Sequence, residues 1–179
     1  MAAIRAWTIS ACAYPTNSTG KARAAEPLVK RRYRDTILEQ ADRVGGTWAQ
    51  NTYPGCACDV PVAAYQLSFA QSMNWTRVYP QQPEIQAYAE EITDRFQLRP
   101  NLRLNEAAEK AVWDEGTKKW TVTTAKGDTL EADAVIGALG QLNRPFWPDI
   151  PGKDSFNGPV MHSAEWDHSV ELEGKRIGI

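Results

Sequence analysis

The chain has 179 residues, of which 42% are apolar and 23% charged, as expected for a globular protein of one domain or one domain and part of a second. Its 20 basic and 22 acidic residues leave a net charge of −2, which excludes a general electrostatic attraction to nucleic acid or to anionic membranes. The apolar run Ala134 to Leu139 is too short to span a bilayer, and the first residues lack the apolar centre of a signal peptide. We therefore expect a cytoplasmic protein.

The cysteines do not indicate a metal site. Cys56 and Cys58 form a Cys-x-Cys pair, but a zinc site needs a second pair of ligands at a workable spacing, and none follows. The two histidines, His162 and His168, lie far along the chain. With Cys12, the total of three cysteines also makes no disulfide framework, so we predict small loop cysteines and no metal.

The first predicted element is a short strand. Residues 1–33 show no clean periodicity, whereas Thr36 to Glu39 is a β-prone run that ends in an acidic residue. A carboxylate at such a strand end can accept hydrogen bonds from the ribose hydroxyls of an adenine nucleotide. The alternative for Glu39 is an ordinary solvated glutamate.

A pair of glycines follows this strand. Gly45 and Gly46 would let backbone N–H groups approach a phosphate or a flavin ring where a Cβ would clash. Trp48, two residues later, could cover an aromatic ring system. The alternative is an ordinary loop with a packing tryptophan.

One amphipathic helix is predicted from Pro83 to Leu98. Pro83 suits a helix start and Pro100 lies just past the end. Apolar residues recur at spacings of three and four and form one stripe: Ile85, Tyr88, Ala89, Ile92 and Phe96.

Three β-prone runs come next and predict a β-meander. They cover residues 107–113, 118–124 and 129–139, separated by turns at Asp114 to Thr117 and Lys126 to Asp128. The last part, Ala134 to Leu139, is continuously apolar, which predicts a strand buried on both faces of a parallel sheet. The expected fold class is therefore α/β with an antiparallel β-meander insert.

The usual first element of a dinucleotide-binding fold is not found. A strand leading into Gly-x-Gly-x-x-Gly and a helix should precede Thr36, and nothing in residues 1–35 fits that pattern.

Two motifs nevertheless resemble one known family. The segment Asp42 to Pro61 is similar to the corresponding segment of class B flavoprotein monooxygenases, above all those of the Baeyer–Villiger type. The second motif resembles that group's fingerprint, Phe-x-Gly-x-x-x-His-x-x-x-Trp-Pro/Asp. Its fixed positions are Phe156, Gly158, His162, Trp166 and Asp167. The resemblance covers residues 34–179 and leaves out residues 1–33.

The resemblance implies a fold and an activity. The fold would be a partial Rossmann-like FAD domain of a protein with two dinucleotide-binding domains. Such enzymes bind FAD, reduce it with NADPH and react it with O2, and the flavin C4a-peroxide then oxidises a small-molecule substrate. Insertion of one oxygen atom into a ketone is the expected reaction, and oxidation at nitrogen or sulfur, as of a sulfide, is the alternative.

The resemblance also implies roles for individual residues. Glu39 would hold the adenosine ribose, Ala108 would lie where the backbone meets the adenine, and Tyr65 would lie near the flavin. Asp59 matches an active-site aspartate that orients an arginine beside the flavin, an electrostatic role. The residues expected to line the FAD are Gly45, Gly46, Thr47 and Trp48. The fingerprint would connect the FAD and NADPH domains, with His162 coupling their movement.

The resemblance divides the chain into three parts. Residues 1–33 form an atypical segment, residues 34–150 a partial FAD-binding domain, and residues 151–179 an interdomain linker with the first strand of an NADPH domain. Leu139 departs from the family, which often has threonine there. Because both glycine-rich phosphate loops are missing, we expect a member truncated at both ends. A second hypothesis is an inactive α/β fragment that serves only as an interaction module. No oligomeric state is predicted.

Overall fold

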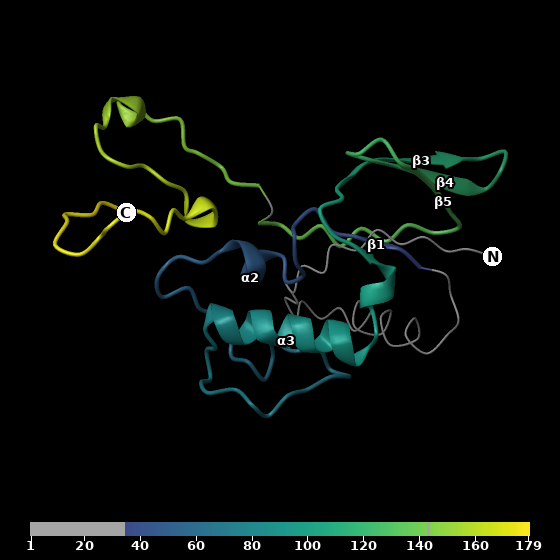
Figure 1. The fold of residues 1–179 in the computed structure, drawn as a ribbon, viewed down its shortest axis with the longest axis horizontal. Helices are drawn as coiled ribbons and strands as arrows, with labels where there is room; N and C mark the ends of the chain where they lie inside the picture. The colour runs from purple at the N-terminus through teal and green to yellow at the C-terminus, as the bar shows by residue number, and fades with distance from the viewer. Residues whose placement is uncertain (1–34, 143) are drawn as a thin grey trace.

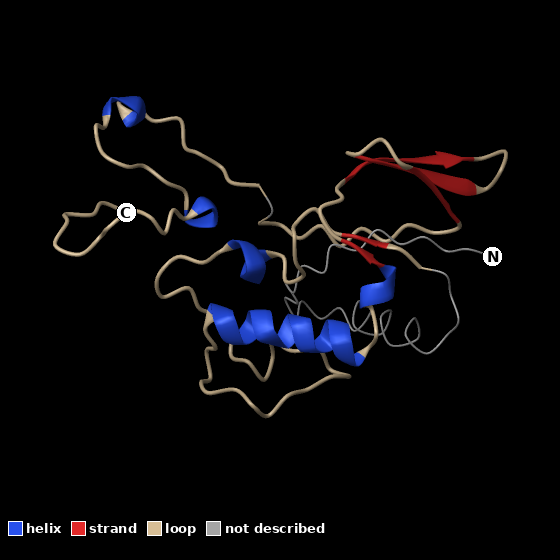
Figure 2. Cartoon of the chain, in the orientation of Figure 1, coloured by secondary structure: helices blue, strands red, loops and turns tan. Residues whose placement is uncertain are grey.

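The computed structural model describes residues 35–142 and 144–179 (Figure 1). The expectations for residues 1–33 lie outside the described residues. The described chain forms a helical part, a small β-meander beside it, and an extended C-terminal arm (residues 144–179) that leaves both (Figure 2).

The predicted helix is confirmed as α3, Gln82–Arg95. Its start is fixed by Glu84, whose carboxylate accepts hydrogen bonds from the backbone N–H of Gln81 at 3.3 Å and of Thr76 at 2.9 Å. The buried residues of its apolar stripe are Ile85, Tyr88, Ala89 and Ile92. It ends before the predicted Leu98, because Gln97 has a left-handed φ of 53°.

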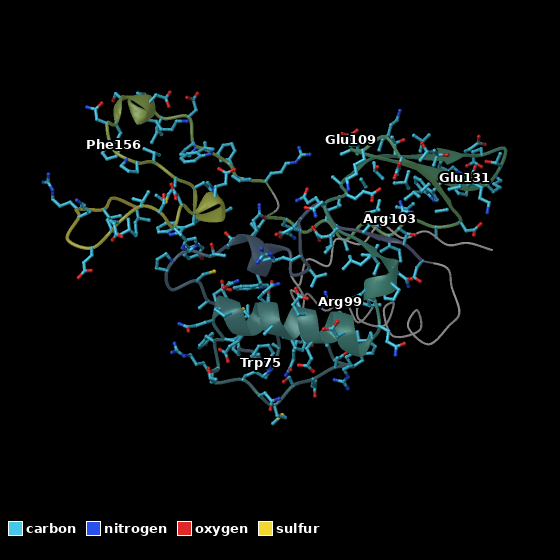
Figure 3. The ribbon with its side chains drawn as sticks, in the orientation of Figure 1. Trp75, Arg99, Arg103, Glu109, Glu131 and Phe156 are labelled. Carbon is cyan, nitrogen blue, oxygen red and sulfur yellow. The ribbon has the colours of Figure 1, made fainter. Side chains whose placement is uncertain are left out.

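The segment between residues 51 and 80 passes beneath α3 and contains little regular structure (Figure 1). It is held by side chains that pack on the helix. Tyr88 donates a hydrogen bond to the carbonyl of Ala70 and accepts one from the N–H of Leu67, both at 2.9 Å. Trp75, which is labelled in Figure 3, packs on the Tyr88 ring with centroids 5.2 Å apart. The apolar face of α3 is therefore the core of this part.

The strands form two small sheets (Figure 2). Strand β1, Ile37–Leu38, pairs in parallel with β2, Leu102–Arg103, which follows the short 3₁₀ helix η1, Arg99–Asn101. The predicted meander is confirmed as three antiparallel strands: β3 (Ala108–Asp114), β4 (Lys119–Thr124) and β5 (Thr129–Ala132).

The strand predicted for Ala134 to Leu139 is wrong. The chain there has no strand pairing, and the Leu139 side chain is 57% exposed. Val135 alone of this run packs on the small cluster of Leu38 and Val122. A buried parallel strand needs neighbours on both edges. Within residues 35–142 and 144–179 the parallel sheet has only the two strands β1 and β2, so it offers this run no position between two neighbouring strands.

The C-terminal arm carries two short 3₁₀ helices, η2 (Lys153–Ser155) and η3 (Ser163–Glu165). Its last residues, 174–179, form no strand. Among the described residues no helix has the length and apolar character needed to cross a membrane.

Truncation of Ile85 tests the importance of the α3 core. The side chain is 1% exposed, so Ile85→Ala should lower the free energy of unfolding by about 2–5 kcal/mol through lost burial and the cavity left behind. Urea unfolding followed by circular dichroism measures this. Leu139→Ala, at an exposed position, is the control and should change the value by less than about 0.5 kcal/mol. Equal effects of the two substitutions would contradict the assigned core.

Candidate functional site

Glu39 lies immediately after β1, as the sequence predicts, and its side chain is 2% exposed. Its Oε1 accepts a hydrogen bond from the backbone N–H of Ala41 at 2.9 Å. Its Oε2 is buried, and no donor among the described residues reaches it. Burial raises the pKa of the Glu39 carboxyl, against the lowering effect of the backbone N–H groups of Ala41 and Gln40. The carboxylate therefore has unused capacity to accept a hydrogen bond.

Glu39 is joined to the start of the meander. Its backbone N–H donates to the carbonyl of Arg103 at 3.0 Å, and its carbonyl accepts from the N–H of Glu106 at 2.9 Å. Ala108 follows two residues later as the first residue of β3 and is exposed. The structure thus brings Glu39 and Ala108, the two residues expected to meet adenosine, into one neighbourhood.

The two glycines form a tight turn between β1 and α2, Thr47–Gln50. Gly45 has φ of 122° and Gly46 has φ of 53°, which are backbone conformations that side chains with a Cβ rarely adopt. Carbonyls of both glycines accept hydrogen bonds from the first backbone N–H groups of α2. The Gly-Gly pair is therefore required by the backbone of this turn, and the predicted approach of a phosphate or flavin to it stays a prediction.

Trp48 and Tyr65 are brought together by this turn. The indole Nε1 of Trp48 donates to the Tyr65 hydroxyl at 3.0 Å, and the two rings meet edge to face with centroids 5.9 Å apart. Both side chains are buried in a cluster with Cys56, Cys58 and Ile85. They brace the turn from inside, and their contact with FAD stays a prediction.

The side chains of Cys56 and Cys58 are buried, and neither forms a disulfide within the described residues. Burial raises the pKa of the Cys56 thiol, which keeps it protonated. Within the described ranges no group of histidine, cysteine or acidic side chains is arranged to hold a metal ion.

Asp59 behaves differently from the other predicted site residues. It is exposed, and no hydrogen bond or ion pair joins its carboxylate to another described residue. It follows the buried Cys58, whose Sγ accepts from the N–H of Val60 at 3.4 Å. The carboxylate is thus presented on a fixed loop and is available to a cation.

The fingerprint forms a series of local contacts on the C-terminal arm. The Phe156 ring, labelled in Figure 3, lies so close to Gly158 that a Cβ there would be 2.6 Å from a ring carbon. His162 Nδ1 accepts a hydrogen bond from the N–H of Ala164 at 3.0 Å and so caps η3. Hydrogen bonds from the Ser169 hydroxyl and N–H lower the pKa of the Asp167 carboxyl.

The arm is connected to the loop before the cysteines. Trp166 of the fingerprint packs on Tyr53 with ring centroids 6.4 Å apart. Thr52 Oγ1 and His168 Nε2 share a hydrogen bond at 2.8 Å. Sequence reasoning assigned no role to Thr52 or His168, because nothing local indicates a contact between residues so distant in the chain.

Comparison with known proteins identifies the family. The family model described as pyridine nucleotide-disulphide oxidoreductase matches residues 56–179, and one described as NAD(P)-binding Rossmann-like domain matches residues 22–81. The chain belongs to the pyridine nucleotide-disulphide oxidoreductase family. The Rossmann-like match begins before Arg34, inside the segment for which the sequence showed no resemblance.

Curated relatives are monooxygenases. A Baeyer-Villiger monooxygenase of Streptomyces coelicolor is 48% identical over 80% of this chain and 27% of its own length. An FAD-binding monooxygenase of Aspergillus niger is 39% identical over 80% of this chain and 25% of its own. A phenazine N-monooxygenase of Lysobacter antibioticus is 36% identical over 79% of this chain and 27% of its own length. The chain thus spans roughly a quarter of the length of these relatives.

A solved structure agrees. Cyclohexanone monooxygenase from Rhodococcus sp. Phi1, crystallised with NADP+, matches with a TM-score of 0.78 and 32% identity over 97% of this chain and 32% of that protein. These findings confirm the resemblance to class B flavoprotein monooxygenases of the Baeyer–Villiger type. They also confirm the α/β, Rossmann-like fold class with its antiparallel insert, and a family of enzymes.

The burial of Glu39 predicts an unusual pH dependence. Its pKa is raised from the ordinary 4.5, so the folded chain binds this proton more tightly than the unfolded chain. The stabilisation from the protonated Glu39 carboxyl is fully present below pH 4.5. It is lost as the pH rises through the higher pKa that this carboxyl has in the folded chain. Glu39→Gln should therefore raise the unfolding free energy at pH 7 by about 1 kcal/mol and leave it little changed at pH 4. Thermal unfolding at several pH values measures this, and equal effects at both would contradict it.

The contact between Thr52 and His168 predicts local protection of the arm. Thr52→Val keeps the shape and removes the hydrogen bond, so the amides of Ala164 and Glu165 should exchange about threefold to tenfold faster. Hydrogen exchange followed by mass spectrometry or NMR measures this, with Thr129→Val on the exposed edge of β5 as control. The control should leave exchange in η3 unchanged. If Thr52→Val also leaves the exchange of the η3 amides unchanged, the contact does not order the arm.

Proposed function

We propose that this chain provides FAD-binding and linker residues of an FAD- and NADPH-dependent monooxygenase. The reaction inserts one oxygen atom from O2 into a small-molecule ketone. In this proposal residues 34–150 form part of the FAD-binding domain, and residues 151–179 form the linker to an NADPH domain. The strand expected at the end of this linker is not formed in the described residues. The observation that carries the proposal is the buried Glu39 carboxylate at the end of β1, with an oxygen that no described donor reaches.

The residues around Glu39 fit an adenine nucleotide. The free Glu39 Oε2 would accept hydrogen bonds from the ribose hydroxyls, and the exposed backbone at Ala108 would meet the adenine. The absence of a Cβ at Gly46 would give the cofactor close access to the backbone of the turn, whereas the space beside Gly45 is taken by Gln86.

Each remaining site residue has a role that follows from its environment. Trp48 and Tyr65, locked together by their hydrogen bond, keep the wall near the flavin rigid. Asp59 is exposed and unpaired with other described residues, so it would orient an arginine by charge-assisted hydrogen bonds. FAD, reduced by NADPH, supplies the oxygen-activating chemistry when bound.

The fingerprint would act as a connector. His162 caps η3 through its Nδ1, and Trp166 packs on Tyr53. These structural contacts are consistent with a role in coupling two domains. The hydrogen bond from the Ala164 N–H gives Nδ1 of His162 a capping role. We therefore assign His162 a positioning role between the FAD and NADPH domains.

Oxidation at nitrogen or sulfur is the second candidate. The similarity to a phenazine N-monooxygenase runs over nearly the same part of the chain as the similarity to the Baeyer-Villiger relatives. Relatives named for both reactions are therefore similar to this part of the chain. The inactive fragment, which binds no FAD, remains the alternative that experiment can separate.

Titration of the purified chain with FAD tests the proposal. Quenching of flavin fluorescence and a shift of the flavin absorbance bands are expected. Loss of the Glu39 charge in Glu39→Gln should weaken FAD binding about tenfold to a hundredfold, because hydrogen bonds to a charged acceptor are lost. Glu131→Gln on the exposed face of β5, labelled in Figure 3, is the matched control and should bind FAD normally.

Two outcomes would count against the proposal. If the unmodified chain takes up no FAD, the inactive fragment is favoured. If Glu39→Gln binds FAD as tightly as the unmodified chain, the assignment of the ribose site is wrong. If the chain does bind FAD, NADPH oxidation measured with a ketone, a sulfide and an aromatic amine as substrates would separate the candidate reactions.

A further inference from the structure

Two glutamines of α3 contact both ends of the Gly-Gly turn. The side-chain amide of Gln82 donates a hydrogen bond to the carbonyl of Trp48, after the glycines. The amide of Gln86, one helical turn later, donates to the carbonyl of Val44 at 2.7 Å, before the glycines. The helix therefore holds residues 44–48 at two points.

Gln86 also fills the space beside Gly45. A Cβ at Gly45 would be 1.9 Å from Gln86 Oε1 and 2.8 Å from its Cδ, both far shorter than any real contact. The glycine is thus required twice, once by its φ of 122° and once by the amide of Gln86. The turn and the helix side chain fit each other as a pair.

The orientation of the Gln86 amide is determined by its neighbours. Its Nε2 faces two acceptors, the carbonyl of Val44 and Oε1 of Glu90, the latter at 3.4 Å. A flipped amide would put an oxygen against both. The carbonyl Oε1 must then face Gly45, where it is buried and has no hydrogen-bond partner among the described residues. Keeping an acceptor unsatisfied in this position costs stability.

We propose that Gln82 and Gln86 are positioning residues for the cofactor: through their amides they set the backbone of residues 44–48, against which the flavin nucleotide binds. The inference rests on the proposed function in one respect, that FAD is the ligand of this turn. Neither side chain needs to touch the cofactor. Their effect is to keep the turn in the conformation that binds the cofactor, so that the turn does not have to become ordered on binding.

Gln86→Met is the principal test, since methionine keeps the length of the side chain and removes both polar ends. In the unmodified full chain the N–H groups of Trp48, Ala49 and Gln50 are bonded to carbonyls of the glycines. Gln86→Met should speed their hydrogen exchange about threefold to tenfold and leave β3 and β4 unchanged. It should also weaken FAD binding by a similar factor and shift the absorbance bands of the bound flavin.

Gln71→Met, the same chemical change at an exposed glutamine outside α3, is the matched control. It should alter neither exchange at residues 48–50 nor FAD binding. If hydrogen exchange at residues 48–50 is the same in Gln86→Met as in this control, the proposed amide contacts are wrong. This conclusion holds whether or not FAD binds. Faster exchange with unchanged FAD affinity and flavin spectrum would overturn the positioning role alone.

A double substitution gives an independent check. Gly45→Ala should weaken FAD binding strongly, because of both φ and the contact with Gln86. Adding Gln86→Ala removes the contact, so the double variant should lose less than the product of the two single losses. Simple multiplication of the two losses would contradict the pairing. If the unmodified chain binds no FAD, the proposed function fails, and the exchange measurement still decides whether the glutamines hold the turn.

Discussion

The burial of one face of α3 is the constraint on which the described fold depends. Ile85, Tyr88 and Ile92 supply the apolar surface that long irregular segments need in order to be held in one arrangement. Tyr88 in addition satisfies backbone groups of the segment beneath the helix. The polar edge of the same helix reaches the Gly-Gly turn through its glutamines. A single helix thus connects the core to the candidate site.

The elements that depend on local sequence were predictable. The helix follows from a spacing that any single segment can display, and the meander follows from its turn residues, with Asp114 accepting from the N–H of Gly116 at 2.7 Å. The run from Ala134 to Leu139 was not, since an apolar run becomes a strand only when partner strands lie on its edges. Composition records that the run is apolar and carries no information on whether those partners are present.

The residues of the candidate site also divide into those with a local sequence signal and those whose contacts depend on distant segments. The position of Glu39 at a strand end and the turn at the two glycines could be predicted, because a strand-terminal carboxylate and a paired glycine are each visible within a few residues. The contacts of Gln82, Gln86, Thr52 and His168 join segments that are distant in sequence, and no local pattern distinguishes these side chains from solvated ones. Gln82 and Gln86 do share one helix face, four residues apart, which is the only signal that could have suggested them.

The unsatisfied oxygen of Glu39 has a consequence for how much folded protein exists. A buried carboxylate with one unused acceptor makes the ligand-free chain less stable than its core alone would allow. A nucleotide whose ribose hydroxyls fill that acceptor would bind only the folded chain, and so would shift the folding equilibrium by mass action. On the proposed function, the supply of flavin nucleotide would then set the survival of this polypeptide against proteolysis as well as its chemistry.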